Sequence, residues 1–337
     1  MTNRTGVWFL ISGIGCAAAI SPHTSAQSFA KTAPLERVTV ASQNGVLRKV
    51  ISAGDSVYLL DTQNHQIHIF TGTKVTTVGQ IGNGKGDLYQ PYDFAVDEGQ
   101  RIYVKDGGNR RIQIFDAQRR DMGAFPDEPR SLGLAVNSHG EVFLGQPQLG
   151  SLISVYDAHG KRLRSFGALV VPSSVYGERF KRFDGYMTAF NRVRIAADES
   201  GNIWAAFVYL PLVYKFDARG NLLFRKRLQY PELDPVVASV GVQPPPQDYA
   251  SLNFDGIQMT VVNRDITYDR HSKTAFLLLG NERTIVLDGT GRDLYGLRPA
   301  IDVGNLQTLS VRDNGDILVT VFGSPKLYRF PSRKEVH

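Results

Sequence analysis

The stretch of residues 90–125 constrains the fold more than any other part of the sequence, because it contains four short strand-like segments in a row. Two apolar runs, at residues 94–96 and 102–104, each end in turn-forming residues, and residues 112–115 alternate between apolar and polar side chains. Residues 122–125 offer a weaker fourth strand. A sheet this small cannot bury its own faces, so copies of the unit must pack against one another.

The unit occurs six times along the chain, and each copy has an aromatic or large apolar residue in its second strand. These residues are Tyr58, Tyr103, Phe143, Trp204, Phe276 and Leu318. The last residue of each third strand follows in step, at Phe70, Phe115, Tyr156, Phe216, Leu287 and Phe330. Repeats of about 40–45 residues with four short strands are typical of β-propellers, and six of them close a ring. We therefore predict an all-β fold, a six-bladed β-propeller of four-stranded antiparallel blades.

The second repeat carries Asp106, Asn109 and Arg111 in the turn between its second and third strands. This pattern resembles the NHL-type repeat of six-bladed propellers, in which an Asp-x-x-Asn-x-Arg hairpin joins those strands. The first repeat keeps the aspartate and the asparagine but has Gln66 in place of the arginine, and the other four repeats lack the signature. The resemblance implies the architecture of the whole ring. It does not assign a function, because related propellers include scaffolds, ligand binders and enzymes.

The two ends of the chain fit closure of this ring. The last repeat supplies strands at about residues 309–311, 317–319 and 326–330, and the residues that follow are too polar for a convincing fourth strand. Residues 37–40 can supply it. We predict that this N-terminal strand completes the last blade, which removes the exposed edges that an open sheet would have.

Residues 1–26 have the features of a signal peptide: Arg4, an apolar run at residues 7–20, and small residues before a cleavage point at Gln27. A membrane anchor is the alternative, but roughly 14 mostly apolar residues are fewer than the ~20 that span a bilayer. We predict export to the periplasm or the medium, leaving residues 27–337 as one propeller domain with no transmembrane segment. We expect it to be a monomer.

Cys16 is the only cysteine and lies inside this leader. Lipidation at Cys16 is a second possibility, although Gly13 stands where a lipoprotein signal has a leucine-like residue. Cleavage before Gln27 would leave no cysteine, so the exported protein would rely on its core rather than on disulfides.

The chain has a net charge of +6, which raises the question of a nucleic-acid ligand. Its basic residues are dispersed, however, and local groups such as Arg119-Arg120 fall in or beside turns, where they form a solvated surface. We therefore predict no nucleic-acid partner.

Two connections between blades are longer than the repeat requires, at about residues 168–189 and 229–262. In a four-stranded meander, connections that leave the fourth strand emerge on the same ring face as the hairpins between strands two and three. Both inserts therefore lie on one face and flank the fourth blade. They are either tolerated insertions or a recognition rim for a protein or a polar polymer. The rim would use Tyr176, Arg179, Phe180, Arg182 and Tyr186.

The first strands line the central channel, and aligning them on the second strands places charged residues at equivalent positions. The aligned residues are Arg48, Asp93, Gly133, Arg194, Asp265 and Thr308. Charges in a narrow channel persist only when they are paired. Arg48, Asp93, Arg194 and Asp265 therefore either form salt bridges with one another or meet a charged ligand.

An enzyme is the alternative function. Lactonase-type propellers, which this chain resembles in blade number, hold Ca²⁺ at the channel mouth with oxygen ligands, and Asp93, Asn191, Asn263 and Asp265 could imitate that site. The two channel arginines argue against it, because they would repel a metal ion. The sequence also has no nucleophile elbow and no phosphate-binding loop. It therefore favours a binding propeller without a cofactor, with a metal-dependent hydrolase or lyase as the alternative.

Overall fold

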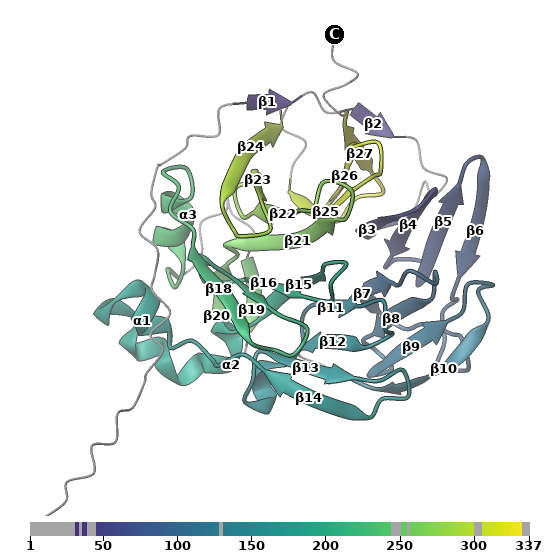
Figure 1. Ribbon diagram of the computed structural model, residues 1–337, viewed down its shortest axis with the longest axis horizontal. Helices are drawn as coiled ribbons and strands as arrows, with labels where there is room; N and C mark the ends of the chain where they lie inside the picture. Colours follow the sequence, from purple (N-terminus) through teal and green to yellow (C-terminus); the bar gives the residue numbers. More distant parts are fainter. Residues whose placement is uncertain are drawn as a thin grey trace, which may run out of the picture.

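The computed structural model describes residues 31–33, 36–38, 45–127, 131–243, 251–254, 257–299 and 305–331. Six antiparallel sheets are arranged around a central axis, and each contributes four strands that follow one another from the axis to the outer rim (Figure 1). The prediction of an all-β, six-bladed propeller is confirmed.

Each blade begins at the axis with its first strand. The first blade consists of β3 (Leu47–Ala53), β4 (Ser56–Asp61), β5 (Gln66–Thr71) and β6 (Lys74–Val78). The second consists of β7 (Pro91–Val96), β8 (Ile102–Asp106), β9 (Arg111–Phe115) and β10 (Asp121–Pro126). The third consists of β11 (Leu134–Val136), β12 (Val142–Gly145), β13 (Ile153–Tyr156) and β14 (Arg162–Phe166), with the short helix η1 (Pro147–Leu149) between β12 and β13.

The remaining blades follow the same order. The fourth consists of β15 (Val193–Ala197), β16 (Ile203–Phe207), β17 (Leu212–Phe216) and β18 (Leu222–Arg227). The fifth consists of β21 (Asn263–Asp269), β22 (Thr274–Leu279), β23 (Thr284–Leu287) and β24 (Asp293–Pro299). The sixth consists of β25 (Leu306–Val311), β26 (Ile317–Val321), β27 (Leu327–Phe330) and the N-terminal strand β2 (Glu36–Val38).

The N-terminal strand closes the ring as predicted. β2 pairs antiparallel with β27, and Arg37 lies opposite Tyr328. The strand before it, β1 (Lys31–Ala33), adds a parallel fifth strand to β24 in the neighbouring blade. The N-terminal segment therefore joins blades five and six, a feature that the sequence did not indicate.

The core lies between the blades. Because successive side chains point to opposite faces of a strand, each blade can bury one face against each neighbour. The second strands β8, β12, β16, β22 and β26 are consequently buried along their whole length. The marker residues Tyr58, Tyr103, Phe143 and Trp204 are completely buried there, which explains why they recur in step with the repeat.

The two inserts are folded segments beside the fourth and fifth blades. The first contains α1 (Pro172–Tyr176), η2 (Glu178–Tyr186) and α2 (Met187–Phe190). The second contains α3 (Asp234–Ser239) and a hairpin of β19 (Ser251–Phe254) and β20 (Ile257–Thr260). Figure 1 shows the helices together at one side of the ring.

Nothing in the described part of the chain forms a helix that is long and apolar enough to cross a bilayer. The predicted signal peptide and Cys16 lie outside the described residues.

Candidate functional site

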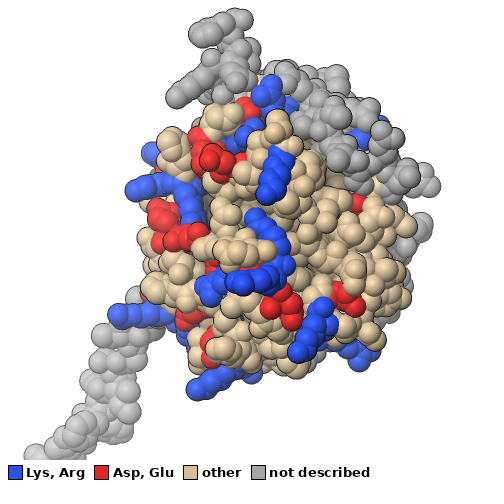
Figure 2. Space-filling view, turned by 90° about the vertical axis from the view of Figure 1, so that its right-hand side faces the viewer, with Lys and Arg blue, Asp and Glu red and all other residues tan. Residues whose placement is uncertain are grey.

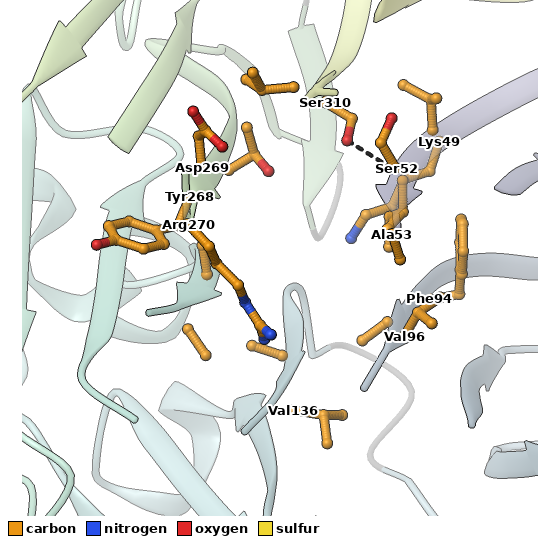
Figure 3. Close-up of a pocket in the computed structure, with 18 of the residues that line it drawn as sticks. Lys49, Ser52, Ala53, Phe94, Val96, Val136, Tyr268, Asp269, Arg270 and Ser310 are labelled. Carbon is orange, nitrogen blue, oxygen red and sulfur yellow. Dashed lines mark hydrogen bonds between the residues drawn. The ribbon is translucent and has the colours of Figure 1, made fainter. Parts of the chain in front are cut away.

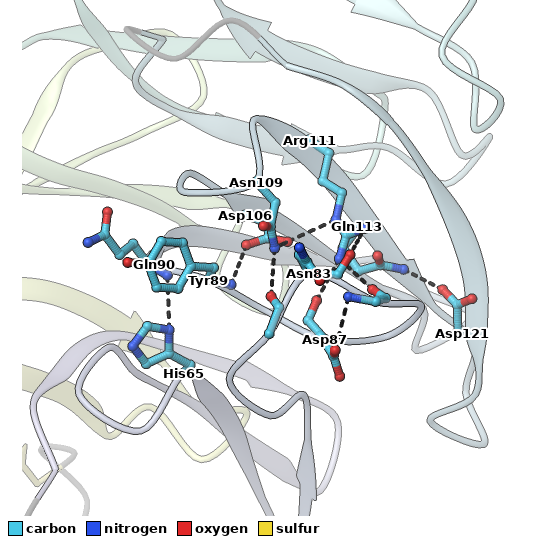
Figure 4. A network of polar contacts seen from close by, with 12 residues as sticks. His65, Asn83, Asp87, Tyr89, Gln90, Asp106, Asn109, Arg111, Gln113 and Asp121 are labelled. Carbon is cyan, nitrogen blue, oxygen red and sulfur yellow. Dashed lines mark hydrogen bonds and ion pairs between the residues drawn. The ribbon is translucent and has the colours of Figure 1, made fainter.

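The hairpin signature of the second blade fixes the loop before that blade. Asp106 is fully buried, and its carboxylate accepts hydrogen bonds from the Tyr89 backbone N–H at 2.6 Å and from the Asn109 amide at 2.7 Å. It also forms an ion pair with Arg111 Nε at 2.9 Å (Figure 4). Arg111 donates in addition to the carbonyl oxygen of Asp87 at 2.8 Å. These contacts hold the 79–90 loop against the ring.

The first blade repeats this arrangement with a histidine in place of the arginine. Asp61 accepts hydrogen bonds from Asn64, and His68 Nε2 lies 3.2 Å from its carboxylate, where the second blade has an arginine. Burial by itself would raise the pKa of Asp61, but hydrogen bonds from His68, Asn64 and the Val46 N–H hold it well below its usual range. The first blade therefore keeps the hairpin although Gln66 stands at the sequence position of the arginine, because His68 lies beside the aspartate instead.

The first insert has an apolar interior. The Phe180 ring lies 4.2 Å from the Tyr176 ring and 5.2 Å from the Phe183 ring, measured between centroids, and Phe180 is only 3% exposed. The Tyr176 hydroxyl donates to the Tyr209 carbonyl at 2.5 Å, and burial raises the pKa of Tyr176. Among the predicted rim residues, Phe180 thus belongs to the core of the insert, while Tyr176 is half-buried and its hydroxyl is bound to Tyr209.

The other predicted rim residues face solvent. Arg179, Arg182 and Tyr186 are exposed on η2. Each arginine lies over the phenylalanine that follows it, at 5.2 Å from the Phe180 centroid and 4.8 Å from the Phe183 centroid. The buried rings therefore position the exposed guanidinium groups.

The second insert packs against the first through apolar contacts. Gly241 lies directly against both buried rings, and a Cβ atom there would be 3.2 Å from Phe180 and 3.0 Å from Phe183. Glu232, which could have closed the rim by pairing with Arg179 or Arg182, instead forms an ion pair with Arg283 of the fifth blade at 3.2 Å. The two inserts pack together as one cap. The exposed Arg179 and Arg182 take no part in the Glu232–Arg283 ion pair.

Large apolar side chains are exposed on this ring face, both in the inserts and in other connections. They lie in connections that leave fourth strands and in hairpins between second and third strands. The residues are Ile81, Tyr89, Leu149, Val171, Tyr186, Val242 and Phe322. Ile81 and Phe322 are 67% and 63% exposed. Apart from Tyr186, sequence reasoning missed this set, although apolar residues at loop positions were a visible signal.

The opposite ring face has a different composition. Its turns join first to second and third to fourth strands, and among the described residues none of these turns exposes a large apolar side chain. They expose charged residues instead, including Asp55, Glu98, Arg120, Arg219 and Lys273. On the side of the ring that Figure 2 shows, Lys and Arg side chains lie next to Asp and Glu side chains. The remaining exposed apolar residues, such as Met122 and Leu223, lie on outer strands.

The charged residues of the channel form a cluster, but the prediction that Arg48 belongs to it at the position of Asp93 is wrong. The connection between Ser52 and Val57 is one residue shorter than the equivalent connection between Val96 and Ile102, so Lys49 rather than Arg48 occupies the position of Asp93. Lys49 forms an ion pair with Asp93. Arg48 instead donates to the Tyr92 carbonyl oxygen at 2.7 Å.

The rest of the cluster is incompletely paired. Arg194 Nε is buried and has no hydrogen-bond partner in the described part of the chain. Burial and the charge of Arg194 lower the pKa of Arg48 to about 10. Burial raises the pKa of Asp265 to about 6 despite the attraction of Lys49 and Arg194, and its carboxylate accepts the Leu309 N–H at 3.1 Å.

The candidate calcium ligands have other partners. The Asn191 amide binds the backbone of Val170 and Met187, and the Asn263 side chain donates to the Phe207 and Leu210 carbonyl oxygens. Asp93 has the ammonium group of Lys49 beside it. In the part of the chain that the structure describes, no group of three or more His, Cys, Asp or Glu residues is placed to hold a metal ion.

The fold defines the class of protein, a six-bladed β-propeller, and the hairpins of its first two blades resemble those of NHL repeats. No family model matches the chain. Two NHL-repeat proteins are similar in sequence. The Drosophila melanogaster protein brain tumor is 28% identical over 140 residues, which are 38% of this chain and 13% of that protein. The Caenorhabditis elegans protein lin-41 is 43% identical over 42 residues, which are 12% of this chain and 4% of that protein. The NHL resemblance is thereby confirmed, over a small part of each relative.

Solved structures share the fold at low identity. Virginiamycin B lyase from Staphylococcus aureus has a TM-score of 0.55 at 11% identity, and the match covers 88% of this chain and 85% of that one. A putative exported protein from Bacteroides fragilis has a TM-score of 0.53 at 15% identity, covering 85% and 83%. At such identities these likenesses establish the fold alone.

Proposed function

We propose that this propeller is a non-catalytic binding module that engages a partner protein through the ring face bearing the two inserts. The propeller fold and its NHL-repeat homologues support a protein-interaction role. We choose this face because exposed large apolar side chains are concentrated on it, including Ile81, Tyr89 and Phe322. Exposed apolar groups concentrated on one side of a soluble protein mark interaction sites.

The exposed charges of this face indicate the chemistry of the partner. The exposed cations of its described residues are Lys85, Arg110, Arg179, Lys181, Arg182 and Lys326, whereas the exposed carboxylates are Glu178 and Asp234. A partner with an apolar patch bordered by Asp and Glu residues would complement it. Tyr186 and the two exposed η2 arginines are of the residue types that dominate interface energetics.

The packed insert favours binding of this kind. Phe180, Phe183 and Phe190 fix the position of η2 before any partner arrives. Less conformational entropy is therefore lost on association than with a mobile loop.

A capture experiment with matched variants tests the proposal. The purified chain is immobilised and exposed to an extract of its native host, and captured proteins are quantified. The variant Ile81→Ser/Tyr186→Ser/Phe322→Ser should lose capture at least tenfold, because each change removes an exposed contact without touching the core. The control Met122→Ser/Leu223→Ser removes apolar side chains of 55% and 52% exposure from outer strands and should capture normally.

A second part of the experiment tests the charge of this face. Arg179→Glu/Arg182→Glu should weaken capture, and the wild-type interaction should weaken as salt is raised. Equal capture by all variants, or loss only with the outer-strand control, would overturn the proposed face. A metal-dependent hydrolase or lyase would instead contain a stoichiometric ion when purified without chelators, and metal analysis of the same preparation decides this.

We also infer export from residues 1–26. N-terminal sequencing of the protein from its native host should begin at Gln27. An intact leader on protein that stays inside the cell would contradict this.

A further inference from the structure

A cavity of about 360 Å³ lies in the central channel. The first strands of all six blades line it, and it extends to the turns that follow those strands, such as Gly54, Glu98 and Asp313 (Figure 3). It therefore opens on the ring face opposite the inserts. Its volume lies at the lower end of the range for small-molecule sites.

The middle of the cavity is lined by uncharged residues. The residues opposite the repeat markers in the first strands all line it, namely Ile51, Ala95, Ala135, Ala196, Thr267 and Ser310. Three of them are alanines, so this layer leaves space at the axis. The next residues along the same strands also line the cavity, namely Ser52, Val96, Val136, Ala197, Tyr268 and Val311. A ligand in this part would contact mainly methyl groups, hydroxyl groups and one aromatic ring.

The charged residues of the lining lie at the two ends of the cavity. Two are at the inner end, Lys49 and Asp265, and five are at the mouth, Asp97, Glu98, Asp269, Arg270 and Asp313. Five carboxylates thus stand against two cations, so the lining as a whole is acidic. A cavity lined by one sign of charge concentrates ligands of the other sign.

Asp265 supplies a buried acceptor at the inner end. It is only 5% exposed, and its Oδ2 accepts the Leu309 N–H at 3.1 Å. Its other oxygen has no hydrogen-bond or ion-pair partner among the described residues. Lys49 and Arg194 attract this carboxylate, but Lys49 forms its ion pair with Asp93. A buried polar atom without a partner is unfavourable, so a ligand with a cationic donor would satisfy it.

The mouth already holds one cation, which belongs to the chain itself. Arg270 Nη1 of the fifth blade lies 2.6 Å from Glu98 Oε1 of the second blade, and these two blades face each other across the ring. Both side chains are about half exposed, at 43% and 46%, and Arg270 extends toward the middle of the pocket (Figure 3). A ligand cation could therefore replace this guanidinium group beside Glu98.

The other mouth carboxylates differ in how far they are occupied. Asp97 is paired with Arg101 at 2.6 Å, and Asp269 accepts backbone N–H groups of its own turn at 3.1 Å. Asp313 is exposed and has no hydrogen-bond or ion-pair partner among the described residues. Glu98 and Asp313 are therefore the carboxylates of the mouth that remain for a ligand.

We propose that this channel cavity binds a linear aliphatic diamine, with one ammonium group at Asp265 and the other at the mouth beside Glu98. The uncharged middle of the cavity accommodates the carbon chain, and the carboxylates at each end receive the two charges. The outer ammonium group takes the place of the Arg270 guanidinium group. The site is separate from the protein-binding face, because it opens on the other side of the ring.

The affinity should depend on pH through Asp265. This carboxylate interacts with Lys49 of β3, Asp93 of β7, Arg194 of β15 and the Leu309 N–H of β25. The strands packed directly against β21 are β22, β25, β15 and β16, and Arg194 is their one titratable side chain. Burial raises the pKa of Asp265 to about 6. Both ligand amines stay charged at neutral and acidic pH, so the affinity should fall as the pH falls from 7 to 5 and Asp265 is protonated.

Calorimetry on the purified chain tests the proposal with the series from diaminoethane to diaminododecane. The monoamine and the dicarboxylate of the best chain length serve as comparisons. The diamine should bind at least tenfold more tightly than the monoamine, because only the diamine reaches both ends. The dicarboxylate should not bind.

Four variants locate the site. Asp265→Asn should lower diamine affinity at least tenfold and remove its dependence on pH. Arg270→Gln should raise the affinity at least threefold, because it frees Glu98 for the ligand. Ala196→Leu, which fills the uncharged middle, should abolish binding while the melting temperature stays within a few degrees. Glu178→Gln, which removes an exposed carboxylate from the other ring face, is the control and should bind normally.

Other outcomes overturn the proposal. Absence of binding across the whole series would show that the channel holds solvent only. A monoamine or a dicarboxylate that binds as tightly as the diamine would show that the two acidic ends do not select the ligand. Binding that survives both Asp265→Asn and Ala196→Leu would place the site elsewhere.

Discussion

The ion pair between Arg111 and Asp106 gives a sharp prediction, because the same chemistry occurs elsewhere in this chain at an exposed position. Replacing Arg111 by Met keeps the aliphatic stem and removes the guanidinium group. Of the donors among the described residues, the fully buried Asp106 would then keep Tyr89 and Asn109. Breaking a buried pair by removing one partner costs about 3–5 kcal/mol. The hydrogen bond to the Asp87 carbonyl oxygen adds about 1 kcal/mol.

We expect Arg111→Met to lower the free energy of unfolding by roughly 5 kcal/mol. Denaturant titration at pH 7, followed by tryptophan fluorescence and circular dichroism, measures it. The matched control is Arg120→Met, which removes the ion pair with Asp116 at 2.7 Å, where the arginine side chain is 75% exposed. That change should have no measurable effect. If the two variants lose equal stability, burial is not what makes the hairpin signature important.

Three further predictions follow from the structure. Deleting residues 31–38 removes both strands that join blades five and six. The melting temperature should then fall by more than 5 °C in a thermal melt. An unchanged melting temperature would refute closure of the ring by β2. Because its pKa is depressed in the folded state, Asp61 should stabilise the fold above about pH 4 and lose that contribution as the pH falls further. Below about pH 4, the free energy of unfolding of Asp61→Asn should therefore fall less steeply with decreasing pH than that of the wild type. Phe180→Ala should destabilise the cap, detected as faster amide exchange in η2, while Tyr186→Ala should leave exchange unchanged.

The architecture was predictable because one physical constraint repeats six times. A blade needs a fully buried second strand, so the marker residues from Tyr58 to Leu318 recur at matching positions. The same logic required a partner for β27, which β2 supplies. The parallel pairing of β1 with β24 could not be foreseen, because three residues without apolar alternation carry no signal for a particular edge.

The channel residues were predictable only to within one position. An alignment of the first two repeats on Tyr58 and Tyr103 at constant spacing matches Arg48 with Asp93. The connection between Ser52 and Val57 is one residue shorter than the one between Val96 and Ile102, and this difference brings Lys49 into the position of Asp93. A constant repeat spacing does not reveal such a change in turn length.

The rim residues show a second limit of sequence reasoning. An insert rich in Phe, Tyr and Arg is compatible with a recognition surface and also with a small hydrophobic core. How the side chains pack decides which residues belong to which. Phe180 became core because Phe183, Phe190 and Gly241 surround it, whereas Tyr186 at the end of η2 remained exposed. The exposed Ile81 and Phe322 were overlooked because they lie in connections of ordinary length, where no insertion drew attention to them.

The two faces of this ring are specialised for reasons that follow from the direction of its strands. Turns after first strands are short and carry capping carboxylates, as at Asp97, where the side chain accepts the Arg101 N–H at 2.9 Å. Such turns leave little room for added apolar groups, but they surround the open end of the channel. Connections that leave fourth strands must cross to the next blade and tolerate insertion, so apolar side chains and the cap accumulate on that side. A protein partner on the insert face would therefore leave the open end of the channel, on the other face, uncovered.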